Sequence, residues 1–136
     1  MALPSVGGGR QVGDGNINEV TLFNQAAAAT ATVTATLTTA QLLNGIIAAS
    51  PGASAAAYTL PLATDLDAAV ANAKTNSSFD FSIINIDGSG SGVITVTTNT
   101  GWTLAGLMTI AATAGTTHMY RARKTGTGTW TLYSLS

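Results

Sequence analysis

The chain has 136 residues, of which 46% are hydrophobic and 8% are charged, and its formal net charge at pH 7 is -1. This length fits a single domain. The near-zero net charge excludes long-range attraction to nucleic acid or to an anionic membrane. The absence of cysteine excludes disulfides and thiolate metal sites. An ordinary soluble domain has about 25% charged residues. We therefore expect this chain to cover much of its surface in an assembly.

The first 19 residues contain five glycines and few apolar side chains, so ordering them alone has a high entropic cost. We expect residues 1–19 to form an extended arm that becomes ordered on a neighbouring subunit, with simple terminal disorder as the alternative. The arm residues expected to contact a neighbouring subunit are Leu3, Val6, Arg10, Val12 and Ile17. The arm does not resemble a secretion signal, and the chain has no run of about 18 apolar residues. We therefore expect a protein that folds in a cytoplasm and does not enter a membrane.

Residues 20–136 are expected to form one β-rich domain. Short strands are expected at residues 20–23 and, from the alternation of threonine with alanine and valine, at residues 31–37. Thr38 and Gln41 have the spacing of a capping box, and Asn44 with Gly45 supplies a C-terminal stop. This pattern predicts a single helical turn between them.

The strongest helix signal in the chain covers residues 64–73. Thr64 is expected as the N-cap, with Asp65 and Asp67 near the positive end of the helix dipole. Apolar residues at helical spacing predict that one face of this helix packs across an open end of the sheet structure.

Residues 78–134 have the pattern of β-strands joined by glycine turns. The expected strands cover residues 79–86, 93–97, 101–104, 117–123 and 129–133. Short segments rich in β-branched and aromatic residues, bounded by Gly, Asn or Asp, are typical of an antiparallel meander. The expected fold is therefore all-β, an antiparallel sandwich or jelly-roll-like barrel with one or two short helices and an extended N-terminal arm.

Two strands carry more detailed expectations. In residues 79–86 the apolar side chains change faces after Ile83, which predicts a bulge or burial on both faces. In the last strand we expect Trp130 to be the largest core side chain and Tyr133 to face outward, as in an edge strand.

No catalytic, cofactor or metal site is expected. His118 is the only histidine and the acidic residues are scattered, which argues against a Ser-His-Asp triad or a transition-metal site. Asp80, Asn85 and Asp87 offer oxygen ligands for calcium, but without the spacing of an EF-hand loop; for Asp87, just before Gly88, a turn or capping role is favoured. The glycine-rich residues 88–92 lack the lysine and the helix of a phosphate-binding loop, so we expect a hairpin loop there.

Arg121, Arg123 and Lys124 are three of the five basic residues. Strand alternation places Arg121 and Arg123 on one face and Lys124 on the other. We favour ion pairs of Arg121 and Arg123 across a subunit contact or to an acidic partner surface; nucleic-acid binding and a solvated face are the alternatives.

Several segments are suggestive as a set. They are TAQLLNGII at residues 39–47, YTLP at 58–61 with DLD at 65–67, SFDFSIIN at 78–85, GWTL at 101–104 and RARKTGTGTWTLY at 121–133. With these segments, residues 39–134 resemble small structural proteins of tailed phages, especially phages of cyanobacteria and other aquatic bacteria. The nearest type is the capsid decoration, or cement, protein.

The resemblance implies a β-rich, non-enzymatic protein on the outer surface of an icosahedral head. Such proteins commonly sit as homotrimers at threefold and quasi-threefold positions and brace the coat subunits against DNA pressure. The implied partners are the major capsid protein and further copies of the chain, with no nucleic acid, membrane or cofactor. No functional-site motif is carried over.

A phage tail or fibre component with a host-surface or glycan-binding role is the alternative. Glycan binding requires exposed aromatic side chains. The candidates are Trp102, Tyr120, Trp130 and Tyr133, and core packing is favoured for each.

Overall fold

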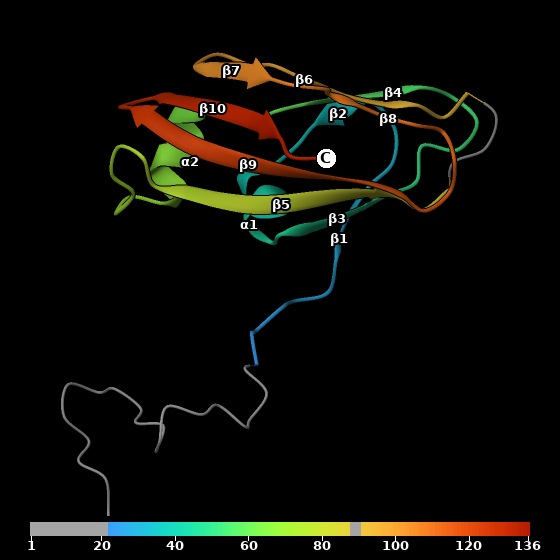
Figure 1. Cartoon of the computed structure of the whole chain (residues 1–136), viewed down its shortest axis with the longest axis horizontal. Helices are drawn as coiled ribbons and strands as arrows, with labels where there is room; N and C mark the ends of the chain where they lie inside the picture. The colour runs from blue at the N-terminus through green and yellow to red at the C-terminus, as the bar shows by residue number, and fades with distance from the viewer. Residues whose placement is uncertain (1–21, 88–90) are drawn as a thin grey trace, which may run out of the picture.

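The computed structural model describes residues 22–87 and 91–136, which form ten strands in two sheets and two short helices. The six-stranded sheet has the order β1 (Ala29–Ala31), β3 (Ile46–Ala49), β5 (Ser78–Asn85), β9 (Thr116–Gly126), β10 (Thr129–Ser134) and β7 (Trp102–Ala105). The four-stranded sheet has the order β2 (Ala35–Thr36), β4 (Ala56–Thr59), β6 (Ile94–Thr97) and β8 (Thr109–Ile110). Helices α1 (Thr39–Leu43) and α2 (Ala63–Ala69) connect β2 to β3 and β4 to β5. The expected β-rich fold with short helices is confirmed (Figure 1).

Strands β1 to β6 alternate between the two sheets, so this part of the chain winds around the core as a coil. Successive strands within each sheet are therefore parallel. The register aligns Thr36, Thr59 and Thr97 in one row, and the hydroxyl oxygens of Thr59 and Thr97 lie 2.9 Å apart. Such cross-strand threonine pairs stabilise a sheet without charge, which accounts for part of the unusual composition.

The expected antiparallel arrangement is wrong in strand direction. Of the eight strand pairings in the described residues, five are parallel and three are antiparallel. Strands β5 and β6, expected to form a hairpin through residues 88–92, belong to different sheets. The last strand, expected at an edge, lies between β9 and β7. Alternation of side chains predicts which residues face inward, but it does not identify the neighbouring strand.

The core lies between the two sheets and includes the inward residues of both. Trp130 is fully buried, which confirms the expectation, and its ring centroid lies 5.9 Å from that of Phe79 and 6.2 Å from that of Trp102. No bulge interrupts the pairing of β5 with β9. The outward Ile84 is half-buried on the outer face of the six-stranded sheet, whereas Ile86 lies beyond the end of β5 and is 54% exposed. Burial on the outer face is therefore limited to Ile84 among the two isoleucines expected there.

The capping box of α1 is confirmed. The backbone N–H of Gln41 donates to the Thr38 hydroxyl at 3.1 Å, and the backbone N–H of Thr38 donates to Gln41 Oε1 at 2.8 Å. Gly45 follows the helix with a φ of +88°, as expected for a C-terminal stop.

Helix α2 differs in its bounds from the expected helix at 64–73. It begins at Ala63 and its N-cap, Leu62, has no side-chain cap bond, while Val70 ends it in a non-helical conformation. The Asp67 side chain accepts hydrogen bonds from Gly128 in the β9–β10 turn and from Trp130 on β10, so tertiary contacts rather than a cap hold this helix.

The strand expected at residues 31–37 is divided into β1 and β2. The chain bends between them, where the Thr32 carbonyl accepts a hydrogen bond from the Tyr58 hydroxyl at 2.7 Å and the Thr34 hydroxyl accepts one from the Ala57 N–H at 3.0 Å. Of the strand expected at residues 20–23, only Leu22 and Phe23 are described, and they form no strand.

Candidate interaction surfaces

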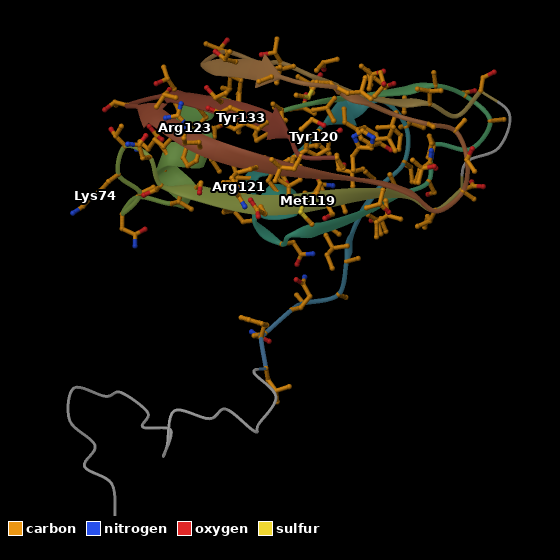
Figure 2. All side chains as sticks on the ribbon, viewed as in Figure 1. Lys74, Met119, Tyr120, Arg121, Arg123 and Tyr133 are labelled. Atoms are coloured by element: carbon orange, nitrogen blue, oxygen red, sulfur yellow. The ribbon has the colours of Figure 1, made fainter. Side chains whose placement is uncertain are left out.

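The expected contact residues fall into two groups. Five of them lie outside the described residues, namely Leu3, Val6, Arg10, Val12 and Ile17. The other two, Arg121 and Arg123, lie on β9 and point to the outer face of the six-stranded sheet, whereas Lys124 is directed to the opposite side. The predicted alternation is therefore confirmed. In Figure 2, Met119, Arg121 and Arg123 follow one another along β9, with Tyr133 beside them on β10.

Arg121 forms a bidentate ion pair with Asp80, the residue opposite it on β5. Its Nε and Nη2 atoms donate to Asp80 Oδ1 and Oδ2 at 2.6 and 2.9 Å. The hydrogen bond from the guanidinium, with its positive charge, holds the pKa of Asp80 below its ordinary value. Both side chains are exposed to solvent, so the pair is an intrachain contact that a partner can still reach.

Arg123 is held by two neighbours on the same face. Its Nη1 donates to Asn76 Oδ1 at 2.8 Å, and its Nε donates to the Tyr133 hydroxyl at 3.0 Å. The guanidinium carbon also lies 5.8 Å from the centroid of the Tyr133 ring, within cation–π range. The contacts fix Arg123 on the sheet surface, so it needs little further ordering when a partner binds.

Lys124 takes part in a partly buried contact between α2 and the hairpin of β9 and β10. Its Nζ lies 3.1 Å from Asp67 Oδ1, and the same carboxylate accepts hydrogen bonds from the Gly128 N–H at 2.6 Å and from Trp130 Nε1 at 2.8 Å. Burial raises the pKa of Asp67, but these three donors outweigh it and hold the pKa below its ordinary value. The residues Arg121 to Lys124 therefore do not form one continuous cationic stripe.

Two polar side chains of β9 face the interior. The Tyr120 hydroxyl and His118 Nδ1 are buried and have no hydrogen-bond partner in the part of the chain that the structure describes. Burial raises the pKa of Tyr120 to about 12, so its hydroxyl stays protonated at neutral pH.

Two of the three candidate calcium ligands, Asp80 and Asn85, have other partners. Asp80 is paired with Arg121, while the buried Asn85 amide donates to the carbonyls of Gly92 and Ala111 at 3.0 and 3.1 Å. Over residues 22–87 and 91–136, no three histidine or acidic side chains come together in a metal-binding group.

The segment before β1 is a surface feature that the sequence pattern did not reveal. Residues 22–28 run away from the two sheets as an extended chain (Figure 1). Its first two side chains are apolar and almost completely exposed, with Leu22 at 86% and Phe23 at 88%. Expected as strand residues, they lack a β partner within the described chain.

The base of this segment is fixed to α1 by side-chain hydrogen bonds. Gln25 Nε2 donates to the Asn44 carbonyl at 2.7 Å, and Asn44 Nδ2 donates to the Ala27 carbonyl at 3.1 Å. Gln41 Nε2 then donates to the Thr30 carbonyl at 2.8 Å. We call these contacts of residues 25–30 with Gln41 and Asn44 the arm clamp. Only the helix boundary was predicted from Gln41 and Asn44; that their side chains also hold a preceding segment depends on the tertiary structure.

A pocket of about 240 Å³, with both apolar and polar lining residues, opens between the two helices and the start of β5. It is lined by Leu43, Val70, Asn72, Ala73, Ser77, Ser78, Phe79 and Trp130, none of them charged. A second hollow of about 460 Å³ lies beside the N-termini of the two helices, and its lining includes the Asp65 side chain.

Comparisons with family models, curated proteins and solved structures found no match to the chain. Neither helix of the described part of the chain has the length and apolar character needed to cross a membrane.

Proposed function

We propose that this protein is a non-enzymatic virion structural protein that binds the outside of an icosahedral phage head, as a homotrimer, and stabilises the coat-protein shell. The proposal combines the resemblance of residues 39–134 to capsid decoration proteins with the surface of the described chain. The implied partner is the major capsid protein, and the implied location is the outer surface of the virion.

The observation that carries the proposal is the extended segment before β1. Leu22 and Phe23 stand 86% and 88% exposed, and burying a side chain of this size contributes about 1.5–3 kcal/mol. The arm clamp orders the base of the segment, so its entropic cost is partly met before any partner binds. An ordered base with exposed apolar side chains beyond it suits a protein that attaches to an assembly.

The uncovered face of the six-stranded sheet supports the same role. Its cationic side chains have partners within the chain. Asp80 neutralises Arg121, and the Tyr133 hydroxyl accepts a hydrogen bond from Arg123. A face of this kind suits close contact with a protein surface better than attraction of a polyanion.

The glycan-binding alternative receives less support. Trp102, Tyr120 and Trp130 are buried, and Tyr133, which is half-buried, contacts Arg123. The aromatic residues that suggested glycan binding therefore offer little exposed ring surface.

Co-sedimentation with empty heads built from the coat protein of the same genome tests the proposal. We expect saturable pelleting and heads that survive a higher temperature. Deleting residues 1–19 should leave the circular dichroism spectrum of a folded domain and weaken the pelleting. A folded full-length chain that does not pellet would contradict the head-binding role and favour a tail component.

A further inference from the structure

We propose that Arg123, on the outer face of the six-stranded sheet, docks on a carboxylate of the partner protein, an aspartate or glutamate side chain on the surface of the coat shell. The inference rests on the proposed function and deepens it, because it names the chemical group that the shell presents to this face. It commits the face to one kind of partner, a protein surface with an acidic side chain opposite Arg123.

Arg123 is a cation without a carboxylate. In the described part of the chain, Arg121 is paired with Asp80 and Lys124 is paired with Asp67, but no acidic side chain is paired with Arg123. The two side chains that accept its hydrogen bonds are a tyrosine hydroxyl and an asparagine amide, and both are neutral. Its positive charge is therefore hydrogen-bonded but not compensated by the described residues.

The two acidic side chains that remain in the described residues lie away from this face. Asp87 follows the end of β5 opposite to Ser78, the residue that is paired with Arg123. Asp65 lies in the first turn of α2, the helix that contacts β9 on the side to which Lys124 is directed. An acidic group for Arg123 has to come from outside the described residues.

A protein that covers this face would remove water from the guanidinium of Arg123, which is already half-buried. Burying a charge without a counter-ion is costly. A carboxylate offsets this cost, because it accepts two parallel charge-assisted hydrogen bonds from one guanidinium. A neutral surface opposite Arg123 would therefore oppose the contact, and an acidic side chain would favour it.

The guanidinium is fixed in position for such a contact. Nε donates to the Tyr133 hydroxyl at 3.0 Å and Nη1 donates to Asn76 Oδ1 at 2.8 Å, while Nη2 has no acceptor in the described part of the chain. Asn76 has a φ of +75°, and its backbone N–H donates to the Lys124 carbonyl at 2.8 Å. The loop before β5 is thereby tied to β9 beside Arg123. Docking then requires little further ordering of this side chain.

Pelleting with empty heads of the same genome at increasing protein concentration tests the contact. We expect Arg123→Gln to raise the concentration at half-saturation at least about tenfold, because charge-assisted hydrogen bonds are lost. Lys74→Gln is the matched control. It removes the same charge from an exposed side chain that points outward from the loop before β5 (Figure 2) and should raise this concentration less than about threefold. Equal effects of the two substitutions would indicate attraction by net charge alone and overturn the inference.

A second control replaces the neighbouring ion pair on the same face. The chain with both Asp80→Asn and Arg121→Gln loses this pair without a change in net charge. We expect its concentration at half-saturation to change less than about threefold. A loss as large as that of Arg123→Gln would overturn the assignment to Arg123. Each variant is checked for a native circular dichroism spectrum.

Heads with amidated carboxylates identify the group that Arg123 contacts. Treatment with a carbodiimide and glycinamide converts the surface carboxylates to amides, and electron microscopy checks that the heads stay intact. On these heads we expect the natural chain and Arg123→Gln to pellet equally weakly. A tenfold difference that persists would place the partner of Arg123 elsewhere, for example on Asp14 or Glu19 of the arm, and would overturn the inference.

Failure of the inference and failure of the proposed function give different results. A natural chain that does not pellet with untreated heads contradicts the proposed function, and the inference falls with it. A natural chain that pellets, together with an Arg123→Gln variant that pellets equally well, overturns the inference and leaves the proposed function standing.

Discussion

Replacing Trp130 tests the description of the core most sharply. The Trp130 ring is fully buried against Phe79 and Trp102, and its Nε1–H donates to Asp67 Oδ1 at 2.8 Å. Trp130→Ala creates a large cavity, which costs about 3–5 kcal/mol. It also removes a hydrogen bond to a charged acceptor, a contact of about 1.5–3 kcal/mol. We expect a loss near the upper end of the cavity range, because these effects are not fully additive.

Urea unfolding followed by circular dichroism measures this loss, and an unchanged slope shows that the comparison is valid. Trp130→Phe is the matched variant, since it retains an aromatic ring and removes only the indole donor and part of the ring. Its expected loss is about 1.5–3 kcal/mol. A loss below about 1 kcal/mol for Trp130→Ala would refute the burial of this side chain, because a cavity of this size costs several times more.

Three further predictions concern Asp67, two glycines and the exposed ion pair. Because the folded state lowers the pKa of Asp67, the contribution of this carboxylate to stability is complete above about pH 5 and disappears as the pH falls through the lowered pKa. The Asp67→Asn variant should therefore lose less unfolding free energy on acidification than the natural chain. An equally steep fall of the unfolding free energy with pH in both proteins would contradict this. Gly101→Ala should cost about 3–5 kcal/mol, because a φ of +90° is combined with a Cβ placed against the Gly128 carbonyl. Gly115→Ala has a φ of +87° but open space around the Cβ, so it should cost only about 1–2 kcal/mol, and equal thermal shifts would refute the difference. Asp80→Asn should change the unfolding free energy little, and less in high salt; a large change would show that the pair is not solvent-screened.

The sequence predicted features that depend on local patterns. The capping box of Thr38 and Gln41, the burial of Trp130 and the opposite directions of Arg123 and Lys124 follow from spacing alone, and the structure confirms them. Strand pairing could not be predicted in this way. Ala48 and Ile84 are paired in a parallel register although they lie 36 positions apart in the sequence. Alternation does not specify which partner a strand will find.

The candidate surfaces were predicted only in part for the same reason. Arg121 and Arg123 were identified, but their partners Asp80 and Tyr133 come from other strands and depend on register. Leu22 and Phe23 were assigned to a strand, because apolar residues in an extended segment have the same pattern whether they pair in a sheet or extend from it. Only the tertiary structure shows that they are exposed.

Asn44 shows how closely the fold and the proposed assembly are linked. It ends α1, its side chain donates to the Ala27 and Ile46 carbonyls, and its own carbonyl accepts from Gln25. A helix of five residues is unstable in isolation, so α1 depends on the capping box and on these contacts. The segment that carries Leu22 and Phe23 is therefore ordered by the same bonds that complete the helix. Since the base of the segment loses little further freedom when a partner binds, more of the apolar burial energy of Leu22 and Phe23 remains available for association.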